Sequence, residues 1–189
     1  MTRIIAGTLK GRILQVPPSG TRPTSERVRE AIFSRLEHMG VIEDARVLDL
    51  YAGSGALGFE AISRGAASLT LVDSSAAAIR TLKKNLPLVP GALVIGADAL
   101  SAVSNRLSGS FDLVFIDPPY DEASQDVTEL LKALLPLCSP DASIVVERST
   151  RSPEVEIPEG LMCEDRRDWG ETRVFFLAPP LDEQDHESE

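Results

Sequence analysis

Val47-Leu48-Asp49-Leu50-Tyr51 runs directly into Ala52-Gly53-Ser54-Gly55-Ala56-Leu57-Gly58, and this stretch decides the fold. The first part is an apolar run of strand length, and the second is a glycine-rich turn that opens a helix. Glycines at such a turn let the backbone approach a ligand closely, and the helix N-terminus favours negative groups. The stretch therefore predicts the first strand-turn-helix unit of a ligand-binding α/β domain.

The residues after this unit continue the alternation of strands and helices. Candidate strands lie at 46–51, 68–73, 92–96, 111–117 and 143–148, and candidate helices lie between them at 56–64, 75–86, 99–107 and 123–135. Such alternation predicts a parallel, doubly wound sheet with helices on both faces. Residues 161–166 and 172–178 are expected to add an antiparallel pair. The predicted fold class is therefore α/β, a Rossmann-like seven-stranded mixed sheet.

The first 24 residues predict a small extension, in which residues 3–6 and 12–16 flank a turn at Gly7–Gly11 and form a β-hairpin. Prolines stiffen the connector that follows. From Ser25 a helix is expected, with its apolar residues on one face and its arginines mainly on the other. The expected organisation is a basic hairpin and connector at 1–24, the main domain at 25–180, and an acidic, disordered tail at 181–189.

Charge is distributed unevenly along the chain. The net charge is −10, yet residues 1–36 carry seven arginines and lysines against two glutamates. A basic arm on an acidic body is the electrostatic footprint of a protein that binds a polyanion. The alternative is that these arginines only solvate a helix face.

Composition excludes several classes of protein. No run approaches the roughly 20 apolar residues that a membrane span needs, and no secretory signal is expected. Cys138 and Cys163 are far apart, so neither a disulfide framework nor a zinc site is indicated, and no metal is expected. We expect a soluble cytoplasmic protein, with nothing demanding more than a monomer.

Acidic residues near the glycine turn indicate the kind of ligand. Asp73 follows the second strand, 20 residues after Gly53, where an acid accepts hydrogen bonds from ribose hydroxyls. Asp49 precedes the glycines and Asp98 follows the third strand. Three carboxylates suit S-adenosylmethionine, which has an ammonium group, a ribose and an adenine amino group but no phosphate. A nicotinamide dinucleotide, the rival, would meet repulsion here and would need a second domain for its substrate.

Asp117-Pro118-Pro119-Tyr120 directly follows the fourth strand, at the edge where ligands bind in open α/β sheets. A carboxylate and a carbonyl oxygen can accept both hydrogens of an exocyclic amino group, while the ring stacks on the base. The acceptors would turn the nitrogen lone pair toward an electrophile. The alternative is that the motif only ends a strand and begins a turn.

These motifs together resemble the class I methyltransferases that modify exocyclic amino groups. Arg3-Ile4-Ile5-Ala6-Gly7, Lys10-Gly11-Arg12 and Arg22-Pro23-Thr24 narrow the resemblance to the RsmD family, the bacterial 16S rRNA guanine-N2 methyltransferases. The likeness runs from about residue 3 to residue 178 and extends through 27–33 and 57–65. It implies methylation of guanine N2 in 16S rRNA, either naked or within a small-subunit particle.

The resemblance also implies a role for each candidate residue. The cofactor would be held by Asp49, Ala52, Gly53, Ser54, Gly55, Asp73, Ser74, Asp98, Ala99 and Asp117. The catalytic set would be Asp117 and the Pro118 carbonyl, which accept the amine hydrogens, with Tyr120 stacked on the base. RNA phosphates would meet Arg3, Lys10, Arg12, Arg22 and Arg27, although Arg27 could instead face the cofactor's carboxylate.

Three other functions remain open from the sequence. The Asp-Pro-Pro-Tyr motif is shared with DNA adenine and cytosine amino-methyltransferases, although no separate target-recognition domain is visible. An assembly factor could bind RNA through the same fold without catalysis, but it would need neither Asp117 nor the glycine turn. A dinucleotide-binding oxidoreductase would be stabilised by nicotinamide cofactors and not by S-adenosylhomocysteine.

Overall fold

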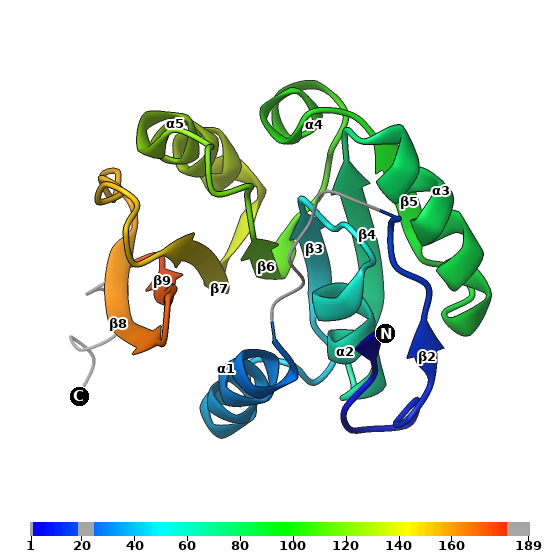
Figure 1. The fold of residues 1–189 in the computed structure, drawn as a ribbon. Helices are drawn as coiled ribbons and strands as arrows, with labels where there is room; N and C mark the ends of the chain where they lie inside the picture. Colours follow the sequence, from blue (N-terminus) through cyan, green and yellow to red (C-terminus); the bar gives the residue numbers. More distant parts are fainter. Residues whose placement is uncertain (1, 19–24, 181–189) are drawn as a thin grey trace, which may run out of the picture.

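The computed structural model describes residues 2–18 and 25–180, and its centre is one seven-stranded sheet. The strands are β3 (Arg46–Leu50), β4 (Ser68–Asp73), β5 (Leu93–Gly96), β6 (Phe111–Ile116), β7 (Cys138–Ser149), β8 (Met162–Trp169) and β9 (Thr172–Ala178). Their order across the sheet is β5-β4-β3-β6-β7-β9-β8, and Figure 1 shows them in the reverse order from left to right. The predicted seven-stranded mixed sheet is confirmed.

The register of the parallel strands aligns their C-terminal ends. Leu50 of β3 lies opposite Val72 of β4 and Ile116 of β6. The next strand outward is also aligned, because Ile116 lies opposite Val146 of β7. Central strands of a parallel sheet are buried on both faces, which explains their nearly continuous apolar sequences.

Helices cover both faces of the sheet. One core is formed by apolar residues of α1 (Glu26–Met39), α2 (Ala56–Ser63) and α3 (Ala76–Asn85) with one set of strand side chains. The alternate strand side chains pack with α4 (Ala99–Asn105) and α5 (Ser124–Leu134) in a second core. Short 3₁₀ turns, η1 (Leu86–Leu88) and η2 (Leu135–Leu137), follow α3 and α5.

Residues 150–161 connect β7 to β8 without a helix or strand. Val155 and Leu161 are buried in the core formed by α4 and α5, so this irregular segment covers the end of that face. Strand β7 begins at Cys138, five residues before the predicted start at 143, because its first residues pair with the beginning of β6 across a register shift.

The N-terminal hairpin is shorter than the sequence predicts. Only β1 (Thr2–Arg3) and β2 (Ile13–Leu14) pair as antiparallel strands. The backbone N–H groups of Ile5 and Ala6 donate instead to the Glu60 carboxylate on α2, which withdraws them from the hairpin. Ile4 and Leu14 are buried in the same core as α1 and α2, so the extension is fastened to the main domain.

One arginine of α1, Arg29, lies on the buried side of the helix and not on the outer face. Arg29 is 1% exposed and forms an ion pair with Glu60, which is also fully buried. Arg64 binds the other Glu60 oxygen at 2.9 Å and lies over the Phe33 ring. Burial of charged groups is costly unless they are paired, and here the pairs tie α1, α2 and the hairpin together.

Part of the predicted RNA-binding set and the predicted tail fall on residues that the structure does not describe. Arg22 and the acidic tail at 181–189 lie outside the described residues, as does most of the proline-rich connector. Among the helices that are described, none combines the length and apolar character of a membrane span. In residues 2–18 and 25–180, no group of three or more His, Cys, Asp or Glu side chains is arranged to hold a metal ion.

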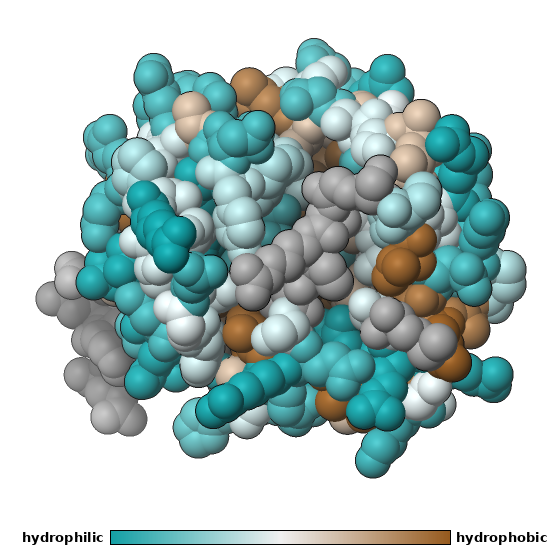
Figure 2. Space-filling view, in the orientation of Figure 1, coloured by the Kyte–Doolittle hydropathy of each residue, from teal (hydrophilic) through white to brown (hydrophobic). Residues whose placement is uncertain are grey.

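The surface on the side seen in Figure 2 is covered mainly by hydrophilic residues. Its brown, apolar residues gather on the right, where Figure 1 labels β2. Ile13 and Val16 of this region are exposed although both are large and apolar.

Candidate active site

The sheet register brings two predicted site residues, Asp73 and Asp117, to the same level as Tyr51. Because Leu50, Val72 and Ile116 are aligned, Tyr51, Asp73 and Asp117 are the next residues of three adjacent strands. This level is the C-terminal edge of the sheet, where ligands bind in open α/β folds. The two motifs that lie more than 60 residues apart in sequence, the glycine turn and Asp-Pro-Pro-Tyr, are therefore neighbours in space.

The glycine turn depends on backbone conformations that favour glycine. Gly53 has a φ of 57° and Gly55 has a φ of 80°. A Cβ added to Gly55 would lie 2.5 Å from Cε2 of Phe59, which is buried in the core. Both the left-handed conformation and the close packing require glycine at position 55.

Asp73 is held in place by two backbone donors. Its Oδ2 accepts a hydrogen bond from Gly53 N at 2.9 Å, and its Oδ1 accepts one from Ser75 N at 2.8 Å. Asp73 thus joins the glycine turn to the end of β4, and it remains partly exposed. Ser74 beside it is exposed, whereas Ala52 and Ser54 in the turn are buried.

Asp49 lies beneath the turn and is 2% exposed. Its Oδ2 accepts a hydrogen bond from Gly58 N at 2.9 Å, so the carboxylate supports the start of α2. Burial raises the pKa of Asp49 well above its usual range, and the nearby carboxylates of Asp117 and Asp73 raise it further. Direct contact of Asp49 with a cofactor ammonium group stays a prediction.

Asp98 occupies the edge of the sheet beyond Asp73. It is the N-cap of α4, where its Oδ1 accepts a hydrogen bond from Ser101 N at 3.0 Å. Asp98 is exposed and Ala99 is buried. The Ala97 N–H donates to the Asp73 carbonyl, which fixes this loop against the end of β4.

These loops fit S-adenosylmethionine in their chemistry. The segments 51–55, 73–75 and 96–98 carry two carboxylates and no arginine or lysine, and the buried Asp49 carboxyl lies behind them. A ligand with phosphates would lack a basic partner in these segments, whereas a cationic nucleoside would meet acceptors. The nearest atom to the Cβ position of Gly53 is 4.0 Å away, so the turn leaves room for a ligand beside its backbone.

Asn85 is a residue of this site that the sequence did not indicate. It is 2% exposed at the end of α3, and its Nδ2 donates to the Ser54 carbonyl in the glycine turn at 3.0 Å. The same side chain exchanges two hydrogen bonds with the backbone of Gln15. An asparagine at a helix end carries no local signal for such a role, because its partners are 31 and 70 residues away.

The loop that carries Asp117 is held from the β3 side by Tyr51. Pro118 is buried, Asp117 is partly exposed, and Tyr120 is 51% exposed. The Tyr51 hydroxyl donates to Oε1 of Glu122 at 3.2 Å. Burial, followed by the Glu122 charge, raises the pKa of Tyr51 above its usual range, so this hydroxyl keeps its proton and stays a donor.

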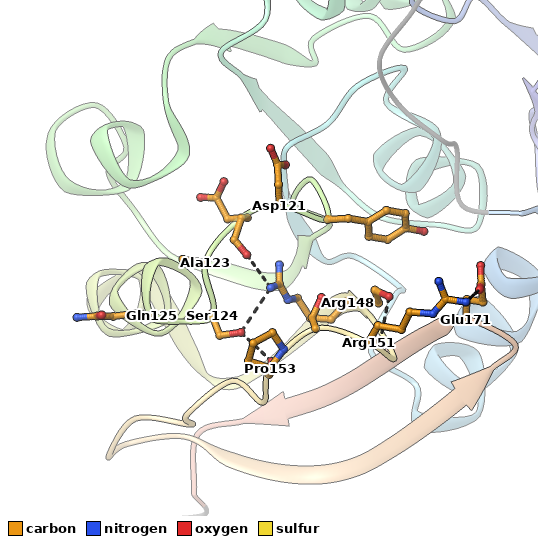
Figure 3. A pocket seen from close by; sticks show the side chains of 12 residues that line it. Asp121, Ala123, Ser124, Gln125, Arg148, Arg151, Pro153 and Glu171 are labelled. Atoms are coloured by element: carbon orange, nitrogen blue, oxygen red, sulfur yellow. Dashed lines mark hydrogen bonds and ion pairs between the residues drawn. The ribbon is translucent and has the colours of Figure 1, made fainter.

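Arg148, at the end of β7, holds the same loop from the other side. Its Nη2 donates to the Glu122 carbonyl at 2.7 Å and approaches Ser124 Oγ at 3.5 Å, as Figure 3 shows. The side chain is buried, and its Nε has no hydrogen-bond partner among the described residues. A Glu-Arg pair ending an apolar strand is unusual, and this signal could have identified Arg148 from the sequence.

An open hollow of about 730 Å³ lies beside Tyr120. The loop 120–125 forms one wall, and the ends of β7 and β9 with residues 151–153 form the other. Figure 3 shows Arg148 between Ser124 and Arg151, with Arg151 paired to Glu171 and Gln125 pointing away. The hollow has the size of a pocket for a nucleotide-sized ligand, and its lining offers both donors and acceptors.

The predicted RNA contacts are only partly gathered near this edge. Arg3, Lys10, Arg12 and Arg27 are all exposed. The hairpin turn that carries Lys10 lies against the C-terminal end of α2, because Thr8 N donates to the Ser63 carbonyl. The glycine turn is at the other end of α2, so Lys10 is remote from the candidate site. Arg3 is engaged with Glu26 at 3.4 Å.

Comparison with known proteins agrees with this geometry. The family model described as conserved hypothetical protein 95 matches residues 2–178. Ribosomal RNA small subunit methyltransferase D of Escherichia coli (strain K12) is 46% identical over 121 residues, 62% of this chain. That match spans 60% of the E. coli enzyme's length.

Two further relatives match over most of the chain. YlbH of Bacillus subtilis (strain 168), provisionally named as an rRNA methyltransferase, is 41% identical over 170 residues, 83% of this chain and 86% of its own. The solved structure of YhhF from Escherichia coli, provisionally named as a methyltransferase, superposes with a TM-score of 0.81 at 34% identity. The superposition covers 96% of this chain and 99% of the YhhF chain.

Proposed function

The chain belongs to the family described as conserved hypothetical protein 95, and from this premise we propose that it methylates guanine N2 in 16S rRNA. The methyl donor in this proposal is S-adenosylmethionine. The names of the E. coli and B. subtilis relatives support an rRNA substrate. The observation that carries the proposal is the alignment of Tyr51, Asp73 and Asp117 at one edge, and it supports Asp117 as an amine acceptor close to the proposed cofactor turn.

S-adenosylmethionine would be held by the glycine turn, Asp73 and the loop around Asp98. Gly53 and Gly55 bring the backbone against it, and Asp73 accepts hydrogen bonds from the ribose. When bound, this cofactor supplies an electrophilic methyl group whose leaving group departs neutral. The chain therefore needs no general acid at this step.

The target guanine would enter the hollow beside Tyr120, which is 51% exposed and whose ring would stack on the base. Asp117 and the Pro118 carbonyl would accept the two N–H bonds of the amino group and turn its lone pair toward the methyl group. Extrusion of a base costs a few kcal/mol, less for an unpaired base, and stacking returns about 1–3 kcal/mol. Positioning for in-line attack would supply most of the acceleration.

After transfer, the alkylated nitrogen is acidic and loses one proton to Asp117 or to water. Tyr51 and Arg148 fix the loop around Glu122 and so keep Asp117 in register with the cofactor turn. We propose that the protein acts as a monomer and in the cytoplasm.

Transfer of labelled methyl groups tests the substrate class. The protein is incubated with labelled S-adenosylmethionine and, in turn, unmodified small-subunit particles, naked 16S rRNA and duplex DNA. We expect label in one or both RNA substrates, and the preferred form shows whether the protein reads naked or assembled RNA. Label in DNA alone would indicate a DNA amino-methyltransferase, and absence of label in all three would favour a non-catalytic binding factor.

A further inference from the structure

A second hollow, of about 400 Å³, lies between α1 and the edge strand β8. It is lined on the α1 side by Ala31, Ser34, Arg35 and His38, and on the β8 side by Arg167 and Trp169. The α1 residues recur at helical spacing, so they form one face of the helix. None of these residues has a part in the site at the Asp117 edge.

The charges in this hollow are mainly positive. Arg35 and Arg167 share one carboxylate, Asp165, at 3.2 Å and 2.9 Å. Two guanidinium groups against one carboxylate leave a surplus positive charge. Arg167 uses its Nε for Asp165 and is 58% exposed, so its outer nitrogens face solvent.

An aromatic ring accompanies these cations. Trp169 is partly buried against the core formed with α1 and also lines the hollow. A half-exposed indole beside guanidinium groups can stack on any base while the cations meet phosphate. This combination fits single-stranded nucleic acid better than an acidic peptide, which would have no use for the flat ring.

The second hollow continues from the proposed substrate site. Trp169 ends β8 and Glu171 precedes β9, so only Gly170 separates a residue of this hollow from one that lines the hollow beside Tyr120. Thr172 of β9 pairs with Ser149 on one side and Trp169 on the other. An RNA strand leaving Tyr120 could cross this turn and reach α1 directly.

We propose that the hollow between α1 and β8 binds a nucleotide of the RNA substrate beyond the target guanosine. Arg35, Arg167 and His38 contact its phosphates, and Trp169 stacks on its base. This inference rests on the proposed RNA methyltransferase function.

Steady-state methyl transfer to 16S rRNA tests the assignment with two variants and one matched control. Arg167→Gln removes an exposed cation, and Trp169→Leu keeps apolar packing but removes the stacking ring. Arg166→Gln changes the neighbouring arginine, which lies on the other face of β8 and pairs with Glu154. The affinity of each variant for S-adenosylhomocysteine is measured in parallel.

We expect Arg167→Gln and Trp169→Leu to raise KM for RNA by about five- to ten-fold, with kcat and S-adenosylhomocysteine affinity unchanged. Arg167→Gln should also reduce the log–log salt dependence of RNA binding by about one. Arg166→Gln should behave as wild type. If wild type methylates RNA but Arg167→Gln matches Arg166→Gln in KM and salt dependence, the second hollow is no RNA site. A wild-type protein that methylates no RNA overturns both proposals.

Discussion

The cofactor side and the substrate side of the sheet edge are built in different ways. On the cofactor side, Gly53, Gly55 and Asp73 lie within 21 residues, and the Gly53 N–H donates directly to the Asp73 carboxylate. On the substrate side, Tyr51, Glu122 and Arg148 come from three strands or loops and meet only when the sheet is assembled. Both halves contain a motif that can be recognised in the sequence, but the contacts that hold the substrate side in place can be recognised only in the structure.

This difference implies that the two halves can be separated by mutation. Substitutions on the substrate side should reduce turnover and leave cofactor affinity intact. Substitutions on the cofactor side should reduce affinity for S-adenosylhomocysteine as well.

The largest effect is expected for Asp117→Ala. Loss of the acceptor that orients the amine should lower kcat by about 100-fold or more. S-adenosylhomocysteine affinity, measured by isothermal titration calorimetry, should stay within about two-fold of wild type because the glycine turn and Asp73 are untouched. Turnover near the wild-type level would remove Asp117 from the catalytic role.

On the cofactor side, a large effect on S-adenosylhomocysteine affinity is expected for Gly55→Ala. The new Cβ would meet the Phe59 ring at 2.5 Å in a left-handed conformation, so the turn must shift. Affinity for S-adenosylhomocysteine should fall by about ten-fold or more, since about 1–3 kcal/mol of strain is introduced. Gly91→Ala is the matched control, because Gly91 also has a positive φ but has open space around its Cβ position. Equal binding by both variants would contradict the role of close packing in the turn.

An intermediate effect is expected for Arg148→Met. The substitution keeps apolar bulk and removes the donor to the Glu122 carbonyl, which costs about 1.5–3 kcal/mol for a charge-assisted bond. We expect kcat to fall by about ten-fold, with unchanged S-adenosylhomocysteine affinity. Arg46→Met serves as the control, because Arg46 pairs with Asp112 at the opposite end of β3 and β6. A fall in cofactor affinity would show that the two halves are not separable.

A separate effect, on stability and not on activity, is expected in the pH dependence of unfolding. The folded protein raises the pKa of Asp49, so it retains a proton that the unfolded chain releases. The contribution of Asp49 to stability therefore falls as pH rises from the ordinary carboxyl range through the raised pKa. Asp49→Asn removes this dependence. As pH rises, the free energy of unfolding of the variant should therefore increase relative to that of the wild type, by up to about 1.4 kcal/mol per pH unit. Urea denaturation at pH 5 and pH 8 measures it, and parallel profiles would contradict the burial argument.

The sequence was sufficient for the sheet, the main helices and the family. Apolar runs alternating with amphipathic stretches predicted the five parallel strands, and the match over residues 2–178 confirmed the resemblance that the N-terminal motifs indicated. Local patterns carry this information because each strand and helix has its own periodicity.

The remaining features depend on contacts between distant residues. The hairpin was predicted too long because Ile5 and Ala6 donate to Glu60, 54 or more residues away. The burial of Arg29 could not be predicted, because nothing nearby in sequence shows its buried partner Glu60. Asn85 acts through backbone groups, which are present at every residue and leave no trace in sequence. Arg148 also acts through a backbone carbonyl, and only its position beside Glu147 at the end of an apolar strand could have indicated it.

Identification of the methylated nucleoside tests the central claim most directly. RNA labelled by the wild-type protein is digested to nucleosides and analysed by mass spectrometry, with Asp117→Ala as the blank. The account predicts N2-methylguanosine that is absent from the Asp117→Ala reaction. A different methylated nucleoside, or the same product at the same level from the variant, would contradict it.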